Sequence, residues 1–256
     1  MKKATRIILI ISVCIVLLFL KWWYQDRIVE YVLQNEMQDY LVERYQEDFT
    51  FVQGKISGDR GGEPFRDSDS DTYQAYFVSA SHPEEQFLVS FYYEGWLDVK
   101  DKRDDYWGVQ YKDTLQSTLE AANSSVFANY RMVDTNVTSI KTGRKGASLD
   151  DCLNDPLAEV YGDLYTTDSP VNVQADMNKL VQAYSQRNLP MDLKIYYVRD
   201  MKALETDDGT LREPKLHEYA HALLYMKKEN RTFEVLTDYM QETYGLNVPK
   251  SWSGSY

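Results

Sequence analysis

Cysteine is almost absent from this chain of 256 residues, which contains only Cys14 and Cys152. Cys14 lies within a long apolar run near the start, so the residues that follow this run cannot form a disulfide among themselves. Exported eukaryotic domains usually carry more cysteines than this. The scarcity therefore favours the outer face of a bacterial membrane, in a cell whose exported proteins do without disulfide chemistry.

Positive charge is also in short supply. The chain has 28 Lys and Arg against 40 Asp and Glu, which gives a formal net charge of -12. An acidic surface repels the phosphate backbone of nucleic acids and the headgroups of anionic lipids. We therefore expect no nucleic-acid partner, and no role at a lipid surface beyond that of an anchor.

The first two dozen residues have the pattern of such an anchor. The basic residues Lys2, Lys3 and Arg6 precede an apolar run over residues 7–20, and an aromatic cluster follows at residues 22–24. A transmembrane helix needs roughly 20 residues to cross the hydrocarbon layer. The run is long enough if the aromatic cluster lies at the lipid headgroups, where Trp and Tyr are enriched.

We predict a transmembrane anchor over residues 7–24, preceded by a cytoplasmic tail of residues 1–6. A cleaved secretory signal begins in the same way, but it needs small residues after its apolar run. Here Lys21 and three aromatic residues occupy that place. Because basic residues hold the short tail in the cytoplasm, the rest of the chain is expected outside a plasma membrane that it crosses once.

The sequence predicts the α+β class, with an N-terminal transmembrane helix followed by two small α+β domains. The first domain is predicted over residues 26–134 and the second over residues 152–248. Residues 135–151 separate them, because this stretch is polar and contains Gly143 and Gly146. This stretch is predicted to be a linker between the domains.

In the first domain, an apolar stripe at every fourth position after Asp26 predicts an amphipathic helix that follows directly on the anchor. Two aromatic runs separated by His82 and Pro83 predict a β-hairpin. The elements expected in this domain are a helix from Asp26 to Tyr45, strands over residues 49–56, 73–80 and 86–93, a helix over residues 106–122, and a strand over residues 129–133.

In the second domain, the pattern predicts mainly helices. A helix is expected over residues 173–187, and a buried strand over residues 192–198. Pro214 suits the first turn of a further helix that runs to about Lys228. Another helix is expected from Thr232 to Tyr244, since Gly245 is placed to cap its end.

One motif in the predicted helix after Pro214 indicates chemistry. His217 and His221 are four residues apart, a spacing at which two helical side chains point the same way and can hold one zinc ion. Glu218 follows the first histidine and is placed to polarise a zinc-bound water. These residues resemble the active helix of zincin metallopeptidases. The resemblance implies that His217 and His221 bind zinc and that Glu218 is the general base.

A third zinc ligand is missing from the motif itself. If the two predicted helices form a hairpin, Glu234 comes to lie opposite His221, and it is the residue expected to complete the site. Zincins, however, build their substrate cleft along a sheet of several strands, and this half of the sequence predicts one strand. The alternative interpretation is a pair of surface or half-buried histidines on an ordinary amphipathic helix, with no cofactor.

The overall layout resembles that of uncharacterised anchored proteins of Gram-positive bacteria. A basic start, one anchor, a helix containing residues 40–45 and a small aromatic sheet carry this resemblance, which covers about the first half of the chain. It rests on no specific motif and implies no particular activity. From the layout as a whole we expect a non-catalytic binding or envelope-accessory module outside the membrane, with a protein or another component of the cell envelope as partner. The alternative function is a membrane-tethered zinc metallopeptidase.

Overall fold

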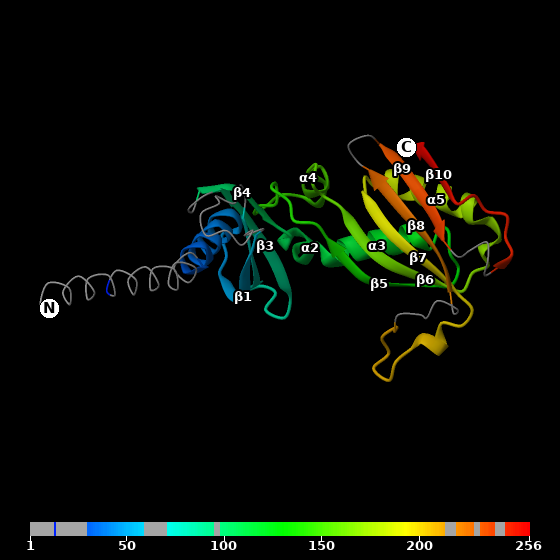
Figure 1. Ribbon diagram of the computed structural model, residues 1–256, viewed down its shortest axis with the longest axis horizontal. Coiled ribbons are helices and arrows are strands. Elements are labelled where there is room, and N and C mark those ends of the chain that lie inside the picture. The colour runs from blue at the N-terminus through cyan, green and yellow to red at the C-terminus, as the bar shows by residue number, and fades with distance from the viewer. Residues whose placement is uncertain are drawn as a thin grey trace, which may run out of the picture. The chain divides into compact units, whose positions relative to one another are not determined.

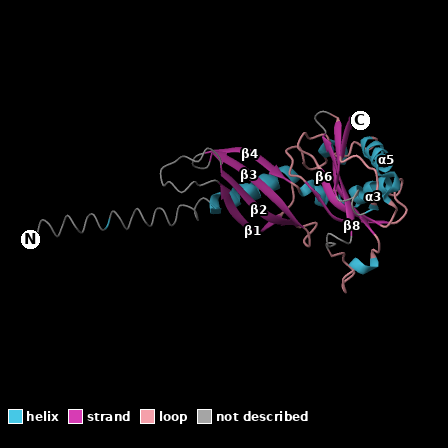
Figure 2. Ribbon diagram, turned by 45° about the vertical axis from the view of Figure 1, so that its right-hand side comes forward, coloured by secondary structure: helices cyan, strands magenta, loops and turns pink. Residues whose placement is uncertain are grey.

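The structure is a computed structural model that describes residues 13, 30–58, 71–94, 98–212, 219–227, 231–238 and 244–256. It is of the α+β class, and the chain divides into two compact units, Met1–Asp104 and Asp105–Tyr256. Each unit contains one sheet (Figures 1 and 2). Apart from Val13, the predicted anchor lies outside the described residues. Within the ranges given above, no helix is long and apolar enough to cross a membrane.

In the first unit, the predicted amphipathic helix is described over residues 30–45. The four stripe residues Leu33, Met37, Leu41 and Tyr45 are all buried. They repeat every four positions, so they share the face of the helix that packs into the core. The prediction of this helix and of its buried face is therefore confirmed for the described residues.

Four antiparallel strands follow in the order β1-β2-β3-β4, each beside the next along the chain. The predicted hairpin is confirmed, with Val78 of β2 opposite Gln86 of β3. Alternate aromatic side chains from these strands, such as Tyr73, Phe77 and Phe91, fill the core. The strands are β1 (Phe49–Gly58), β2 (Asp71–Ser79), β3 (Gln86–Glu94) and β4 (Asp98–Asp104), the last of which the sequence did not predict.

Polar contacts attach the helix of residues 30–45 to β4. The hydroxyls of Tyr40 and Tyr45 donate to Asp104 at 2.9 and 2.6 Å, and Arg44 lies 3.8 Å from the same carboxylate. Asp104 is fully buried. Lys102 of β4 also pairs with Glu36 of the helix at 2.8 Å. The helix is thus held by a buried carboxylate as well as by its apolar face.

The second unit is built on a six-stranded sheet in the order β10-β9-β8-β7-β6-β5. Neighbouring strands are antiparallel except β6 and β7, which are parallel and are joined by a crossover through α5. The strands are β5 (Tyr130–Val137), β6 (Val160–Thr166), β7 (Met191–Val198), β8 (Tyr219–Lys227), β9 (Thr232–Asp238) and β10 (Ser251–Ser255). The helices are α2 (Tyr106–Gln110), α3 (Lys112–Asn123), α4 (Leu149–Leu153) and α5 (Val173–Ser185), with 3-10 turns η1 (Pro170–Asn172) and η2 (Lys202–Leu204).

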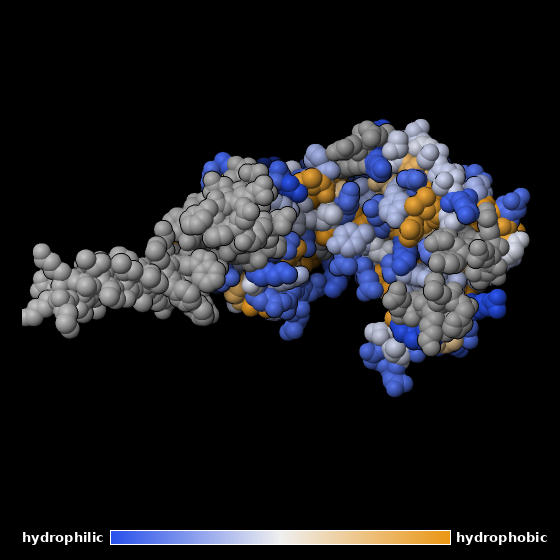
Figure 3. All heavy atoms as spheres, viewed as in Figure 1, coloured by the Kyte–Doolittle hydropathy of each residue, from blue (hydrophilic) through white to orange (hydrophobic). Residues whose placement is uncertain are grey.

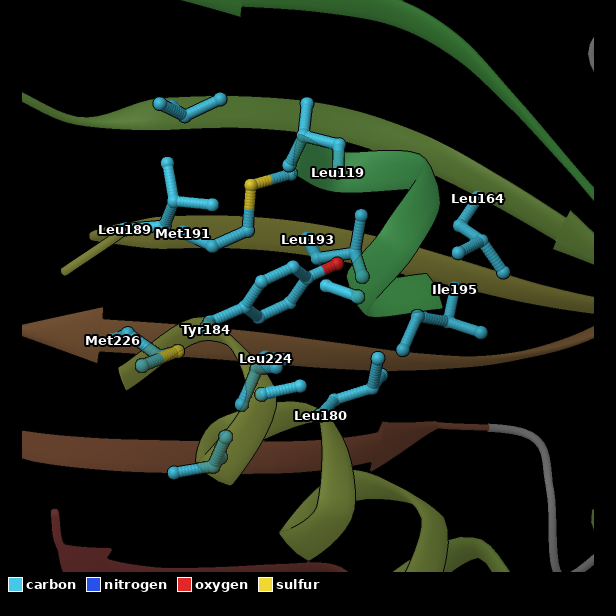
Figure 4. Packing of buried hydrophobic residues seen from close by; sticks show 14 of the residues in the cluster. Leu119, Leu164, Leu180, Tyr184, Leu189, Met191, Leu193, Ile195, Leu224 and Met226 are labelled. Atoms are coloured by element: carbon cyan, nitrogen blue, oxygen red, sulfur yellow. The ribbon is translucent and has the colours of Figure 1, made fainter. Parts of the chain in front are cut away.

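Helices α3 and α5 lie on the same side of this sheet (Figure 2), and the main core lies between them and the strands. Leu193 of β7 and Leu224 of β8 point to this side, where Tyr184 of α5 lies among them (Figure 4). The Tyr184 hydroxyl donates to the side-chain oxygen of Asn123 in α3. This buried hydrogen bond joins the two helices. We call this the helix side of the sheet, and the other face the opposite side.

The division between the two units falls earlier than the sequence predicted. Helices α2 and α3 and strand β5, assigned to the first domain, lie in the second unit. The stretch 135–151 is not an open linker, because its first three residues belong to β5 and Ile140 is fully buried. Backbone amides of Lys141 and Thr142 also donate to the buried carboxylate of Asp155, both at 3.0 Å. Its polar residues therefore form a structured connection inside one unit.

Two predicted helices are wrong. Residues 219–227 form strand β8 and residues 232–238 form strand β9, and the two strands pair as an antiparallel hairpin. Side chains of β8 are apolar or aromatic on both sides of the sheet, so the strand reads as a continuous apolar run without a clear period of two. By contrast, the predicted helix over residues 173–187 and the predicted strand over residues 192–198 correspond to α5 and β7 and are confirmed.

Candidate functional site

The zinc motif does not lie on a helix where the structure describes it. His221 is the third residue of β8, while His217 and Glu218 lie outside the described residues. The argument from helical spacing, which placed both histidines on one helix face, therefore fails. Among the described residues, no group of three or more His, Cys, Asp and Glu side chains is placed to hold a metal ion.

The predicted third ligand is also displaced from His221. Glu234 of β9 lies opposite Tyr225, whereas the residue opposite His221 is Asp238. Four strand residues span about 13 Å, so Glu234 lies that far along the hairpin from His221. The expectation that a turn near residues 229–230 would bring Glu234 beside His221 is thus wrong, because a strand hairpin has a different register from a helical one.

His221 instead belongs to an aromatic row on the opposite side of the sheet. The ring centroids of Tyr165 and Tyr196 are 4.6 Å apart, and those of Tyr196 and Tyr219 are 5.0 Å apart. The His221 ring lies 5.6 Å from that of Tyr219. All four side chains are buried, and Leu204 of η2 packs against the row. The arrangement is that of a satellite core beneath residues 199–212.

Among the described residues, two accessible grooves lie at the C-terminal edge of the second unit. A groove of about 500 Å³ runs between α5 and the end of the chain, on the helix side of the sheet. Two amide side chains of α5, that of Gln186 directly after the helix, and the rings of Phe233 and Tyr256 line it, together with smaller residues. The lining of this helix-side groove is Asn178, Val181, Gln182, Ser185, Gln186, Phe233, Gly254, Ser255 and Tyr256.

Gly254 shapes this groove. It lies opposite Phe233 in the β9–β10 pair, and a Cβ atom at position 254 would come within 2.7 Å of the Phe233 ring. The ring therefore covers the backbone of Gly254 and forms part of the groove wall. Any larger residue at position 254 would displace the ring, so this contact requires glycine.

A second groove, of about 580 Å³, meets the first at β10. Its side chains come mainly from positions that the register places on the opposite side of the sheet, such as Lys227, Glu234 and Ser253. The lining of this opposite-side groove is Lys227, Thr232, Phe233, Glu234, Ser253, Gly254 and Ser255. Both volumes fall within the range of roughly 300–1,000 Å³ that is typical of ligand sites.

The chemistry of the two grooves suits binding. Amides and hydroxyls donate and accept hydrogen bonds, and the two aromatic rings of the helix-side groove offer apolar contact. Lys227 and Glu234 add one charge of each sign in the opposite-side groove. On the face seen in Figure 3, hydrophobic residues of the second unit lie in patches separated by hydrophilic ones, so the surface offers apolar contacts between polar groups.

Asp192 of β7 gives the second unit a pH dependence that can be measured. The pKa of this carboxyl is raised to about 6, mainly by burial and also by the charge of Glu159, while a backbone hydrogen bond from Met226 and the charge of Lys227 oppose the rise. The folded unit holds the proton more tightly than the unfolded chain, where the pKa is 3.8. Stability from this group is therefore present below about pH 4 and is lost as the pH rises to about 6.

We expect Asp192→Asn to remove this loss, because the amide does not ionise. Relative to the wild type, the variant should gain about 1 kcal/mol of unfolding free energy between pH 4 and pH 7, a value reduced for the partial exposure of the group. Urea unfolding of both proteins at pH 4, 5, 6 and 7 measures the difference. If the free energies of unfolding of the two proteins change in parallel with pH, Asp192 does not titrate in this window.

Sequence reasoning did not find the two grooves. They depend on residues from α5, β9 and the C-terminal strand, which are up to about 80 positions apart and meet only through the sheet order and the crossover. One signal was present near the end of the chain, where Trp252 and Tyr256 alternate with Ser and Gly as expected for a strand. That pattern predicts a strand but does not show what lies beside it.

Comparisons with known proteins place the chain in no characterised family. No protein-family profile matches it, and no curated protein matches it. A distant structural match is the crystal structure of a DUF5037 family protein from Ruminococcus gnavus ATCC 29149 at 2.55 Å resolution, with 14% sequence identity and a TM-score of 0.36. The match covers 65% of this chain and 75% of that chain. Likeness at this level supports no transfer of function.

Proposed function

We propose that this chain is a membrane-anchored extracytoplasmic protein that binds a partner of the cell envelope at the C-terminal edge of its second unit and carries out no catalysis. The observation that carries the proposal is the pair of grooves that meet at β10. Their amide and hydroxyl groups keep one protonation state near neutral pH, which suits recognition. General acid–base catalysis instead needs groups whose pKa lies near the working pH.

The proposed placement depends on the first 24 residues. Three basic residues before an apolar run, followed by an aromatic cluster, support an uncleaved anchor with its N-terminus in the cytoplasm. Both units would then lie outside the plasma membrane. The near absence of cysteine supports a bacterial envelope, and the acidic charge opposes nucleic acids as ligands. The partner we propose is a protein or another envelope component.

One labelling experiment tests the placement and the binding together. Gln182 of α5 lines the helix-side groove, whereas Gln116 of α3 is an exposed glutamine that does not. Each is changed to cysteine in the full chain, in which Cys152 is buried. Intact cells are treated with a maleimide that carries a benzophenone and does not cross membranes, and then with light.

We expect both cysteines to react with the maleimide, because both lie outside the membrane. After illumination, only Gln182→Cys should give a discrete cross-linked product, because only that position contacts a bound partner. Failure of both cysteines to react would contradict the extracytoplasmic placement. Equal cross-linking from positions 116 and 182 would contradict binding at the groove.

The alternative, a zinc metallopeptidase, is tested by metal analysis. We expect the purified full chain to contain no stoichiometric zinc, and His221→Ala to leave its metal content unchanged, because His221 lies in a strand among Tyr196 and Tyr219. The variant should lose about 1–3 kcal/mol of unfolding free energy through lost packing, since the side chain is 8% exposed. One zinc per chain that is lost in His221→Ala would favour the peptidase, and Glu218→Gln would then test the base.

A further inference from the structure

Strand β10 presents a row of backbone groups to solvent. It lies at the end of the sheet, and among the described strands it pairs with β9 alone. Beyond its two ends, Thr237 donates to Lys250 at 2.9 Å and Tyr256 donates to Arg231 at 2.8 Å. Hydrogen-bonded pairs alternate along an antiparallel ladder, so the even residues of β10 bond to β9. The amide and carbonyl groups of Ser251, Ser253 and Ser255 therefore point away from the sheet.

The other described sheet edges carry features that oppose the addition of a further strand. In the first unit, β1 is interrupted by a bulge between Phe51 and Gln53, and β4 has charged residues at six of its seven positions. In the second unit, β5 has a bulge between Val133 and Asn136. Bulges and charges are the usual means by which edges avoid pairing with other chains. Strand β10 has neither charge nor proline nor bulge in its register, although it is short.

The two grooves are arranged as an added strand would need them. Side chains of an extended peptide alternate between the two faces of a sheet. Residues placed opposite Trp252 and Gly254 would point to the helix side, where the helix-side groove lies. Residues placed opposite Ser253 and Ser255 would point to the other side, into the opposite-side groove. One groove on each face, both bordering the same edge, matches recognition by strand addition, in which backbone bonds give affinity and alternate pockets give specificity.

We propose that β10 binds an extended peptide segment of another protein as a seventh strand of the sheet. This rests on the proposed function, because it specifies the ligand of the same edge. The segment carries aliphatic or aromatic side chains at alternate positions, which fit the Phe233 and Tyr256 rings beside Val181 in the helix-side groove. Its intervening side chains are polar and lie beside Ser253 and Ser255, in the cross-strand rows that continue to Glu234 and Lys227.

A second copy of this chain fits the edge less well than a foreign peptide. Strand β10 of another copy would offer only serine and glycine side chains, apart from Trp252, to grooves of about 500 and 580 Å³. Each copy also carries a formal charge of -12, so two copies repel each other. A neutral or basic segment avoids this repulsion. The charge therefore favours a peptide that is not acidic.

The test uses the full chain in detergent micelles and a random library of linear ten-residue peptides displayed on phage. Peptides that are enriched on the wild type are synthesised, and their dissociation constants are measured for two variants. Ser253→Pro removes the outward amide while leaving the bonds to β9, and proline is accepted on an edge strand in that orientation. Ser253→Thr is the matched control, since it keeps the amide. We expect at least tenfold weaker binding to Ser253→Pro and a change within about twofold for Ser253→Thr.

A second measurement does not depend on the folding of a variant. The selected peptide is N-methylated at its odd or at its even residues, and both forms are titrated against the wild type. Strand addition predicts that N-methylation of one alternate set of residues weakens binding at least tenfold, while N-methylation of the other set changes it little. The reason is that only alternate amides of the peptide face the edge of the sheet. Equal effects of the two sets, unchanged binding to Ser253→Pro, or failure to enrich any peptide would overturn the proposal.

Two further outcomes separate this inference from the proposed function. If Gln182→Cys cross-links in cells while Ser253→Pro leaves that product unchanged, the groove binds a partner but not as an added strand. If the wild type forms dimers in sedimentation experiments and Ser253→Pro is monomeric, the edge belongs to a second copy and the peptide proposal is wrong. Absence of the cross-link from position 182 would contradict the proposed function itself.

Discussion

Replacing Asp104 by alanine should destabilise the first unit by about 3–5 kcal/mol, the usual cost of leaving the partners of a buried carboxylate unpaired. Burial raises the pKa of Tyr40 and of Tyr45, and the charge of Asp104 raises both further. Both hydroxyls therefore keep their protons and donate to this one carboxylate. With alanine at position 104, the buried Tyr45 hydroxyl, the partly buried Tyr40 hydroxyl and the Arg44 guanidinium lose their common partner.

Hydrogen exchange of the full chain, followed by mass spectrometry, measures this effect unit by unit. Peptides from residues 30–58 and 71–94 should exchange faster in Asp104→Ala, while peptides from residues 149–212 should keep the wild-type rate. Asp98→Ala is the matched control on the same strand, because the Asp98–Lys100 pair is largely exposed. Loss of this pair should lower the free energy of unfolding by less than about 1 kcal/mol. Equal protection in both variants would show that the buried carboxylate does not hold the helix.

The first unit was largely predictable because its elements obey simple local periods. The helix of residues 30–45 has one apolar stripe between charged residues, and the buried positions of β2 alternate with more exposed ones, as expected for a strand in a sheet with one buried face. Strand β4 was missed for a physical reason. Its sequence is Asp-Val-Lys-Asp-Lys-Arg-Asp, and such a charged segment is a strand only because β3 supplies its hydrogen-bond partners.

The β8–β9 hairpin was mispredicted because local preference and tertiary environment disagree there. Strand β8 contains Ala, Leu, Met and Lys, which are good helix formers. Between β7 and β9, however, the first four residues of this segment are buried on both faces of the sheet, and an apolar run suits such a central strand. The zinc hypothesis depended on the same helix prediction, because the spacing of His217 and His221 brings the two side chains to one metal ion only if both lie on a helix.

The candidate site was harder to predict than the fold, because it lies at the β10 edge of the second sheet, and the sequence of a strand does not show whether that strand is at an edge. Nothing in the sequence of Ser251 to Ser255 tells whether a further strand lies beyond it. The groove next to it arises because the crossover between β6 and β7 brings α5 near the last strand. A single sequence reports periods within elements, whereas the order of strands in a sheet follows from long-range packing.

The unit boundary gives the last prediction, since the sequence and the structure assign Trp107 to different parts of the chain. The sequence placed it in the first domain, whereas the structure buries it completely in the core of the second unit. Its indole nitrogen donates to the carbonyl of Thr138 at 2.8 Å. Removing a buried tryptophan costs about 3–5 kcal/mol through lost contacts and the cavity left behind.

Trp107→Ala should therefore speed hydrogen exchange in peptides from residues 149–212 by a factor that corresponds to about 3–5 kcal/mol, and leave residues 30–58 unchanged. Val171→Ala serves as the control, because Val171 lies in the same unit and is 66% exposed, so it should cost less than about 0.5 kcal/mol. Faster exchange in residues 30–58 but not in 149–212 would return Trp107 to the first domain and restore the predicted boundary at residues 135–151. With Asp104→Ala acting on one side of the Asp104–Asp105 bond and Trp107→Ala on the other, the two variants locate the division to within three residues.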